Sequence, residues 1–141
     1  MPTTEQVRQI FAPFGEGNAA AFFESVSDDV DWQFTHVGTF CPIAGHYHSK
    51  AEFQEGTKAL SSTWASPLKL QIENIVCDGR QAAVEMKAVD TKCKSGLVFS
   101  NEYTWVCEFN DLNMIVKIRA YMDTDLVVRA IQENRKLGTG A

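Results

Sequence analysis

The sequence predicts a single α+β domain, residues 1–141, in which a cone-shaped, curved antiparallel sheet wraps around N-terminal helices and a short helix ends the chain. Residues 4–62 show short helical patterns around one strand, whereas residues 68–123 read as four long strands joined by tight turns. Helices kept to one side of an antiparallel sheet define the α+β class. Long, twisted strands curl around such helices and leave a cavity between them.

Composition argues against several classes of function. The formal net charge is -5 and the 13 Lys and Arg residues are scattered, whereas nucleic-acid binding needs clustered cations. We find no apolar run near the ~18 residues that cross a bilayer and no signal peptide, so we expect a cytoplasmic protein without membrane contact. The four cysteines form no Cys-x-x-Cys pair and are expected to be thiols.

Two short helices are expected at the start of the chain. Residues 4–14 place apolar side chains at helical spacing, and Pro13 and the glycines that follow it end this pattern. A second helix is expected from about Asn18, with Phe22 and Phe23 against the core.

One strand and a third helix follow. Residues 30–37 alternate as a strand does, with His36 on the same face as the aromatic side chains and therefore interpreted as a core histidine. Ser49 and Glu52 have the spacing of a capping box, which predicts a helix over residues 50–62.

The second half of the chain reads as strands and a closing helix. The Asp78-Gly79 pair is a strong hairpin signal. Asp123 or Thr124 caps a helix expected over residues 125–134. The four strands are expected at residues 68–78, 81–92, 99–109 and 114–123.

The last of these strands carries the main functional prediction. One alternate set of its side chains is wholly apolar and predicts a core face. The other set includes Arg119, Tyr121 and Asp123, which place a cation, a phenol and a carboxylate in line, about 6.5 to 7 Å apart. This polar set lines the cavity or meets solvent or a partner subunit, and a single β-bulge would exchange the faces.

Six segments carry a resemblance to a known family: Trp32, Pro42–Gly45, Tyr47–Lys50, Ala83–Met86, Asn101–Trp105 and Arg119–Asp123. In their order the chain resembles the nuclear transport factor 2-like (ketosteroid isomerase-like) superfamily, and more closely its SnoaL-like branch of polyketide cyclases and isomerases. The resemblance implies a deep pocket, acid-base chemistry without a cofactor, and homodimers packed through the outer sheet face. It also implies a catalytic role for Asp123, although the fold alone does not fix the reaction.

Five residues are candidates for catalysis, each with a structural alternative. Asp123 abstracts a proton or caps the last helix. Arg119 and Tyr121 hold an enolate oxygen, with Glu85 as a second carboxylate. Alternatively, Arg119 and Glu85 form a structural ion pair or occupy solvated positions. His48, before the capping box, has an ordinary pKa near 6.5 that suits proton transfer.

Six further residues are candidate substrate contacts: Trp32, Phe34, Phe40, His46, Tyr103 and Trp105. Their rings stack on a flat substrate, and Tyr103 donates to a developing oxyanion; core packing, or a surface position for His46, is the alternative. The spacing of His46, His48 and Glu52 is similar to a cupin metal motif. Because Glu52 falls in a helix and no second motif follows, we expect no metal.

These residues predict a cofactor-independent isomerase or cyclase that uses acid-base catalysis. Its substrate is expected to be a carbonyl-containing, hydrophobic or aromatic metabolite of polyketide or terpenoid origin, in secondary-metabolite biosynthesis. Two alternatives stay open. One is an epoxide hydrolase or dehydratase with paired carboxylates, and the other is a non-catalytic ligand-binding or dimerisation module.

Overall fold

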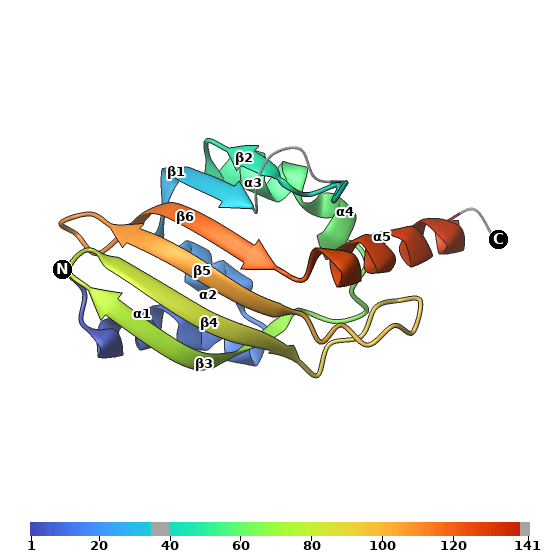
Figure 1. The fold of residues 1–141 in the computed structure, drawn as a ribbon, viewed down its shortest axis with the longest axis horizontal. Coiled ribbons are helices and arrows are strands. Elements are labelled where there is room, and N and C mark those ends of the chain that lie inside the picture. Colours follow the sequence, from blue (N-terminus) through green and yellow to red (C-terminus); the bar gives the residue numbers. More distant parts are fainter. Residues whose placement is uncertain (35–39, 139–141) are drawn as a thin grey trace.

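A six-stranded sheet curves over the N-terminal helices in the computed structural model, which describes residues 1–34 and 40–138 (Figure 1). The strands are β1 (Val26–Phe34), β2 (Gly45–Tyr47), β3 (Lys69–Asp78), β4 (Gln81–Val89), β5 (Glu102–Phe109) and β6 (Ile115–Met122). The helices are α1 (Thr4–Phe11), the short 3-10 helix η1 (Ala12–Glu16), α2 (Ala19–Phe23), α3 (Lys50–Gly56), α4 (Lys58–Ser61) and α5 (Thr124–Gly138). This arrangement confirms the predicted α+β class.

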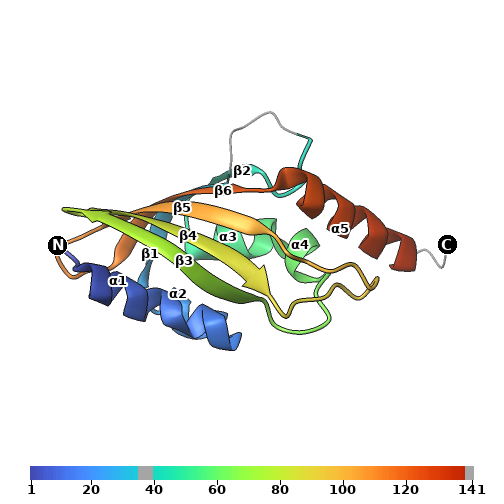
Figure 2. The same ribbon diagram turned by 60° about the horizontal axis from the view of Figure 1, so that its bottom comes forward.

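The sheet has the strand order β2-β1-β6-β5-β4-β3. Strands β3 to β6 form the predicted antiparallel series, but β1 runs parallel to β6, so the sheet is mixed rather than purely antiparallel. Figure 2 shows helices α1 to α4 on one side of the sheet, which we call the inner face, and α5 beyond the end of β6. The inner face and these helices enclose the core.

The N-terminal helices form where the sequence predicts them. Thr3 and Gln6 make a reciprocal capping box at the start of α1, in which the Thr3 hydroxyl accepts from the Gln6 backbone N–H at 3.1 Å. Pro13 and Gly17 bound η1, and Gly17 takes a positive φ of 75° that few other residues adopt. The predicted first helix is therefore an α-helix that continues as a 3-10 turn.

The predicted third helix is wrong as one continuous element. It divides at Thr57, whose backbone has φ -107° and ψ 5°. The Thr57 hydroxyl donates to the carbonyl oxygen of Phe53 at 2.8 Å, a bond to the preceding turn that competes with regular helix geometry. Helices α3 and α4 result, with Phe53 and Leu60 buried on their shared side.

Strand β1 begins earlier than the sequence predicts. Its first residue is Val26 and not residue 30, and the added residues lie at a register shift against β6. His36, predicted to continue this strand on its core face, lies outside the described residues.

A β-bulge in β6 alters the predicted faces of that strand. Ile115 pairs with Phe109 and Lys117 pairs with Glu108, so one extra residue interrupts the register. Ile118 and Ala120 are buried, as their alternate spacing predicts, but Ile115 is buried as well although its spacing placed it in the polar set. The bulge moves Ile115 to the inner face and leaves the residues after it in register.

Aromatic side chains make up the centre of the core. Trp32 is fully buried and stacks on Phe53 with ring centroids 3.7 Å apart, while its edge meets Trp105 at 5.3 Å. Phe11 and Phe22, from α1 and α2, pack on the other side of Trp105. These contacts fasten the helices to the inner face of the sheet.

Two further structural facts concern the sequence predictions. The four cysteines form no disulfide bond, and burial raises the pKa of the Cys107 thiol, which keeps it protonated and unreactive.

Within residues 1–34 and 40–138, no helix has the length and apolar character to span a bilayer.

Candidate functional site

A cavity of about 430 Å³ lies between the inner face of the sheet and the helices. Its lining is almost wholly apolar and draws on β1, β5, α2, α3, α4 and the segment before β3; it includes Phe34, Phe53, Leu60, Trp64, Tyr103 and Trp105. The volume lies within the range of small-molecule sites, and aromatic walls with few polar groups are typical of them. We call this the aromatic cavity.

Tyr103 gives the aromatic cavity its clearest reactive group. The side chain stands on the inner face of β5, between Met86 of β4 and Met122 of β6, and is 4 % exposed. Burial raises the pKa of the Tyr103 phenol well above its ordinary value, because the phenolate would lose its hydration. The phenol is therefore protonated at neutral pH and acts as a hydrogen-bond donor.

Indole N–H groups add unused donors to the cavity wall. Trp64 and Trp105 line the aromatic cavity, and the Nε1 atom of each is buried without a hydrogen-bond partner. A buried donor left unpaired costs about 1–3 kcal/mol, so unpaired groups in a native structure need an explanation. Neither N–H has an acceptor among the described residues.

Formal charge is scarce in the cavity wall. Lys58 is the one charged side chain among the described lining residues, and its Nζ pairs with Glu55 at 2.7 Å, with both side chains largely exposed. The described lining contains no carboxylate and no imidazole. The paired carboxylates that epoxide opening requires are thus not found in this part of the wall.

The predicted catalytic residues Arg119, Tyr121 and Glu85 lie on the opposite, outer face of the sheet. Tyr121 pairs with Thr104 of β5, which points away from the neighbouring cavity residues Tyr103 and Trp105 because successive strand residues face opposite sides. Tyr121 is 50 % exposed and lines a shallow outer hollow together with Glu85. The polar side chains of β6 were predicted to line the cavity or to meet solvent or a partner subunit. In the structure, Arg119 and Tyr121 lie on the outer face and do not line the cavity.

Of the two structural alternatives for Arg119 and Glu85, the ion pair is not found among the described residues, whereas Glu85 is exposed to solvent. Arg119 lies opposite Val106 in the register of β5 and β6. Glu85 instead accepts a hydrogen bond from the Asn74 side-chain amide of β3 at 2.9 Å. A strand separates the two charges, because Glu85 stands on β4 and Arg119 on β6.

Asp123 has the geometry of a helix cap. Its Oδ1 accepts from the Leu126 backbone N–H at 3.3 Å, which satisfies one of the open donors at the start of α5. Its own backbone N–H donates to Oδ1 of Asn101 at 3.0 Å. The capping alternative is thus present, while the exposed carboxylate is not part of the described cavity lining.

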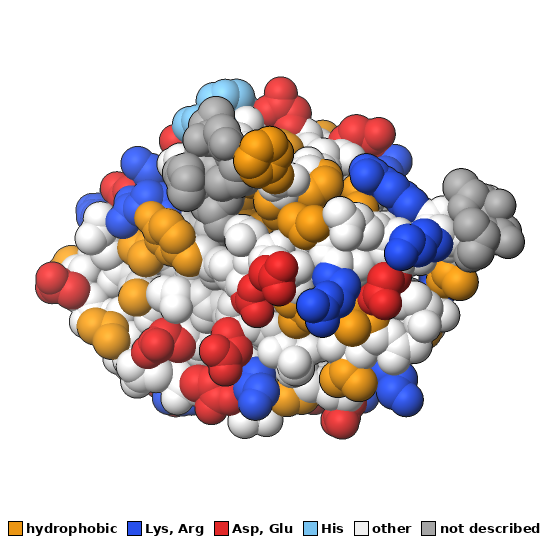
Figure 3. Space-filling model, turned by 45° about the vertical axis from the view of Figure 1, so that its right-hand side comes forward, with side chains coloured by type: hydrophobic (Ala, Val, Ile, Leu, Met, Phe, Trp, Pro, Cys, Tyr) orange, Lys and Arg blue, Asp and Glu red, His pale blue; other side chains and the backbone are white. Residues whose placement is uncertain are grey.

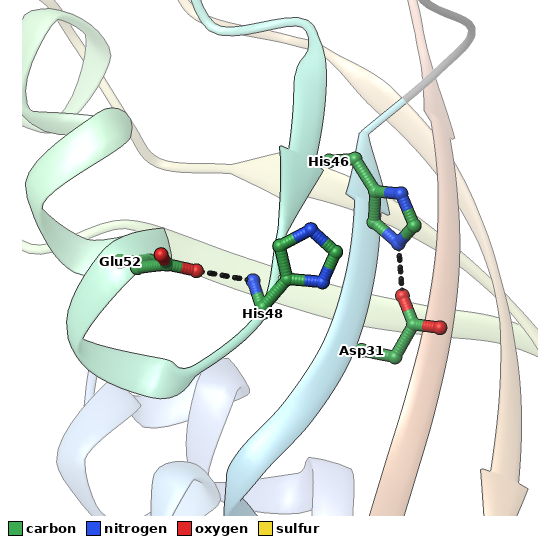
Figure 4. Close-up of polar contacts among 4 residues, drawn as sticks. All are labelled: Asp31, His46, His48 and Glu52. Carbon is green, nitrogen blue, oxygen red and sulfur yellow. Dashed lines mark hydrogen bonds and ion pairs between the residues drawn. The ribbon is translucent and has the colours of Figure 1, made fainter.

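His46 and His48 form a second polar cluster at the β2 edge of the sheet (Figure 4). The His46 Nε2 atom contacts Oδ1 of Asp31, and the His46 and His48 rings are 4.5 Å apart. The Ser49 hydroxyl accepts from the Glu52 backbone N–H at 3.0 Å, which is one half of the predicted capping box. The Glu52 carboxylate accepts from the backbone N–H of His48 at 2.5 Å, one residue before the cap. In Figure 3 the histidine side chains lie on the surface at the upper edge of the view.

This histidine cluster is outside the aromatic cavity. His46 and His48 are both exposed, and neither is among the described lining residues. No group of three His, Cys, Asp or Glu side chains in the described part of the chain is placed to hold a metal ion.

The predicted substrate contacts separate into three groups. Phe34, Tyr103 and Trp105 line the aromatic cavity. Trp32 lies in the core and supports the lining residue Phe53, whereas Phe40 is 100 % exposed.

Sequence reasoning missed the wall that α3 and α4 provide. Phe53, Thr57, Leu60 and Trp64 line the cavity at helical spacing. Their helical spacing is visible in the sequence, but such a stripe does not distinguish a cavity wall from ordinary core packing. These residues form the cavity wall because α3 and α4 cover the inner face of the sheet.

Comparisons with known proteins agree with this architecture. A family model described as "SnoaL-like domain" matches residues 7–118. A solved NTF2-like protein from Burkholderia thailandensis is 21% identical, with a TM-score of 0.71 over 93% of this chain and 98% of that chain. BvnE pinacolase from Penicillium brevicompactum is 12% identical, with a TM-score of 0.71 over 94% of this chain and 93% of that chain.

A further solved structure similar to this chain contains a ligand. TerC, co-crystallised with polyporic acid, is 13% identical, with a TM-score of 0.70 over 91% of this chain and 96% of that chain. At these identities the structures share the fold with this chain. Comparison with curated protein sequences finds no match.

Proposed function

The chain belongs to the SnoaL-like domain family, and from this membership we propose that it is a cofactor-independent isomerase or cyclase. Its substrate is a flat, hydrophobic, carbonyl-containing metabolite of polyketide or terpenoid origin that binds in the aromatic cavity. The observation that carries the proposal is the protonated phenol of Tyr103, buried in an otherwise apolar, aromatic wall.

Tyr103 acts on the carbonyl oxygen of the substrate. When a water molecule in the cavity accepts a proton from the carbon next to the carbonyl, the electron pair of the broken C–H bond forms a C=C bond and negative charge develops on the oxygen. The Tyr103 O–H donates to this oxygen more strongly in the transition state than in the ground state, which accelerates the step. Return of a proton at another carbon gives an isomer, and attack of the enolate on a second carbonyl closes a ring.

Features of similar proteins support the ligand class. TerC was crystallised with polyporic acid and BvnE is named a pinacolase. In this chain, the unpaired indole N–H of Trp105 beside Tyr103, with ring centroids 6.0 Å apart, provides a second donor for an oxygenated ligand. A ligand with carbonyl oxygens on an aromatic frame fits both the donors and the apolar wall.

Deuterium exchange into β-tetralone, a flat bicyclic ketone, tests the proposed chemistry. In D₂O the wild-type protein is expected to accelerate exchange of the protons next to the carbonyl, measured by NMR. Tyr103→Phe is expected to lower the enzyme-dependent rate by about a hundredfold to a thousandfold, since it removes one oxyanion donor. Tyr121→Phe, which removes a phenol from the outer face, is the matched control and should exchange at the wild-type rate. Equal rates for wild type and Tyr103→Phe would contradict the role of Tyr103.

The same assay tests the predicted base. Asp123→Asn keeps a side-chain oxygen that caps α5 but removes the carboxylate. Because Asp123 is not part of the described cavity lining, we expect this variant to retain most of the exchange rate. A loss as large as that of Tyr103→Phe would assign the proton transfer to Asp123 as the sequence predicts.

A ligand-binding protein without chemistry is the second candidate function. It is favoured by one observation, that the described lining contains no carboxylate or imidazole to accept a proton from carbon. Under this alternative β-tetralone binds in the cavity but exchanges no faster than in buffer. The exchange experiment therefore separates the two candidates.

We also propose that the chain forms a homodimer through the outer face of the sheet. Val76 and Tyr121 on β3 and β6 are 58 % and 50 % exposed, which leaves large side chains for a partner to cover. Sedimentation equilibrium should give twice the mass of one chain. A monomeric mass at micromolar concentration would contradict this proposal.

A further inference from the structure

Asn101 is a buried polar residue to which the proposed reaction gives no role. It lies just before β5 and is 1 % exposed, and its backbone carbonyl accepts from the Ala88 N–H at 2.8 Å. The side-chain Oδ1 accepts from the Asp123 backbone N–H at 3.0 Å. That bond fixes which end of the amide is oxygen, because an NH₂ group cannot accept from a backbone N–H.

The other end of this amide is a donor without a partner. Nδ2 of Asn101 is buried and makes no hydrogen bond of normal geometry. Replacing Asn by an apolar residue of similar size would remove this unpaired group, so burial alone does not explain it. A buried donor held in a fixed orientation is typical of a group that is used at a functional site.

Tyr103 is the neighbour on which this donor acts. The two residues are two positions apart and both are buried. Asn101 lies opposite Ala88 and Tyr103 opposite Met86, so their side chains occupy successive positions on the inner face of the sheet. The Asn101 amide favours the phenolate and so opposes in part the rise that burial causes in the pKa of Tyr103. When a phenol oxygen accepts a hydrogen bond, its own hydrogen points to a different acceptor.

We propose that Asn101 is a positioning residue for Tyr103. Its Nδ2–H donates to the phenol oxygen in the ligand-bound protein and directs the phenol O–H toward the ligand carbonyl in the aromatic cavity. The inference rests on the proposed function, because it needs Tyr103 to contact the ligand oxygen. The Asp123 backbone N–H holds the Asn101 amide in this orientation.

The carbonyl stretching frequency of bound fluorenone tests this role. Fluorenone is a flat ketone, and its hydrocarbon counterpart fluorene reports the shape and stability of the cavity without an oxygen. In wild-type protein we expect the bound C=O stretch to lie at lower frequency than in an apolar solvent, and in Tyr103→Phe this shift should be lost. Asn101→Leu should lose much of the shift and weaken fluorenone binding about fivefold to tenfold, with fluorene affinity unchanged.

A second variant and saturating ligand keep the test decisive. Asn101→Leu also removes the acceptor for the Asp123 N–H, so Asn101→Ser, whose shorter side chain still offers an oxygen but no amide donor, is measured beside it. The spectrum is recorded at saturating fluorenone, so that it reports only bound ligand even when affinity falls.

The outcomes separate the two proposals. A wild-type shift that Tyr103→Phe loses and both Asn101 variants keep would overturn the role of Asn101 while the role of Tyr103 stands. A bound fluorenone without any shift in the wild type would instead contradict the proposed function itself. Partial loss in both Asn101 variants, with fluorene binding preserved, is the result that the positioning role predicts.

Discussion

Trp32→Ala is expected to lower the free energy of unfolding by about 3–5 kcal/mol, the range for removing a buried large aromatic side chain. Trp32 is fully buried, stacks on Phe53 at 3.7 Å and meets Trp105 at 5.3 Å, so it joins β1 to α3 and to β5. Its removal opens a void that the curved sheet cannot close without moving α3. Urea denaturation followed by far-UV circular dichroism measures the change without relying on tryptophan fluorescence.

Phe40→Ala is the control for this prediction. It also removes an aromatic side chain, but Phe40 is fully exposed. We expect a loss of about 1 kcal/mol or less. Similar losses for the two variants would mean that Trp32 is not the centre of the core.

Ser61→Trp is expected to abolish most ligand binding while leaving the fold intact. Ser61 is exposed at the end of α4 and lines the aromatic cavity, so an indole side chain at this position occupies space that a ligand needs. We expect fluorene affinity to fall by about tenfold or more, which corresponds to about 1.4 kcal/mol of binding free energy. Isothermal titration with fluorene measures this change.

The adjacent residue supplies a closely matched control. Ser62 is exposed, follows Ser61 at the end of α4 and also donates from its hydroxyl to a carbonyl oxygen of the preceding turn, but it is not part of the cavity lining. Ser62→Trp should bind fluorene within about twofold of the wild type. Equal binding by the two variants would show that the ligand does not occupy the aromatic cavity.

Much of the fold was predictable because it depends on short-range patterns. The Ser49 cap of α3 and the Asp78-Gly79 hairpin are local signals, and the structure contains both of them. The parallel pairing of β1 with β6 was not predictable in this way, because it joins strands more than 80 residues apart. The division of α3 from α4 at Thr57 depends on one side-chain hydrogen bond that competes with the helix.

The candidate site was harder to predict than the fold. Sequence spacing correctly groups Arg119 and Tyr121 on one face of β6, but it does not say which face meets the cavity. That depends on how the whole sheet curves and on which side the helices pack. The sequence predicts Tyr103 and Trp105 as substrate contacts and not as catalytic residues, because an aromatic residue in a strand is usually explained by packing.

The distribution of polar groups also misled the sequence reasoning. Charged residues in strands, such as Glu85, attracted a functional interpretation because burial of a charge is costly. In the structure Glu85 is exposed and bonds to Asn74, whereas the buried polar group beside Tyr103 is the uncharged Asn101. The informative signal is a buried side-chain NH₂ group without a hydrogen-bond acceptor. Only the three-dimensional structure reveals which side chain carries it.

A crystal structure of the protein with fluorenone tests the central claim most directly, that the aromatic cavity is the functional site. We predict that the ligand lies between Phe53 and Trp105, with its oxygen about 2.7–2.8 Å from the Tyr103 phenol oxygen. A ligand found on the outer face beside Glu85 and Tyr121, with the cavity empty, would contradict the account.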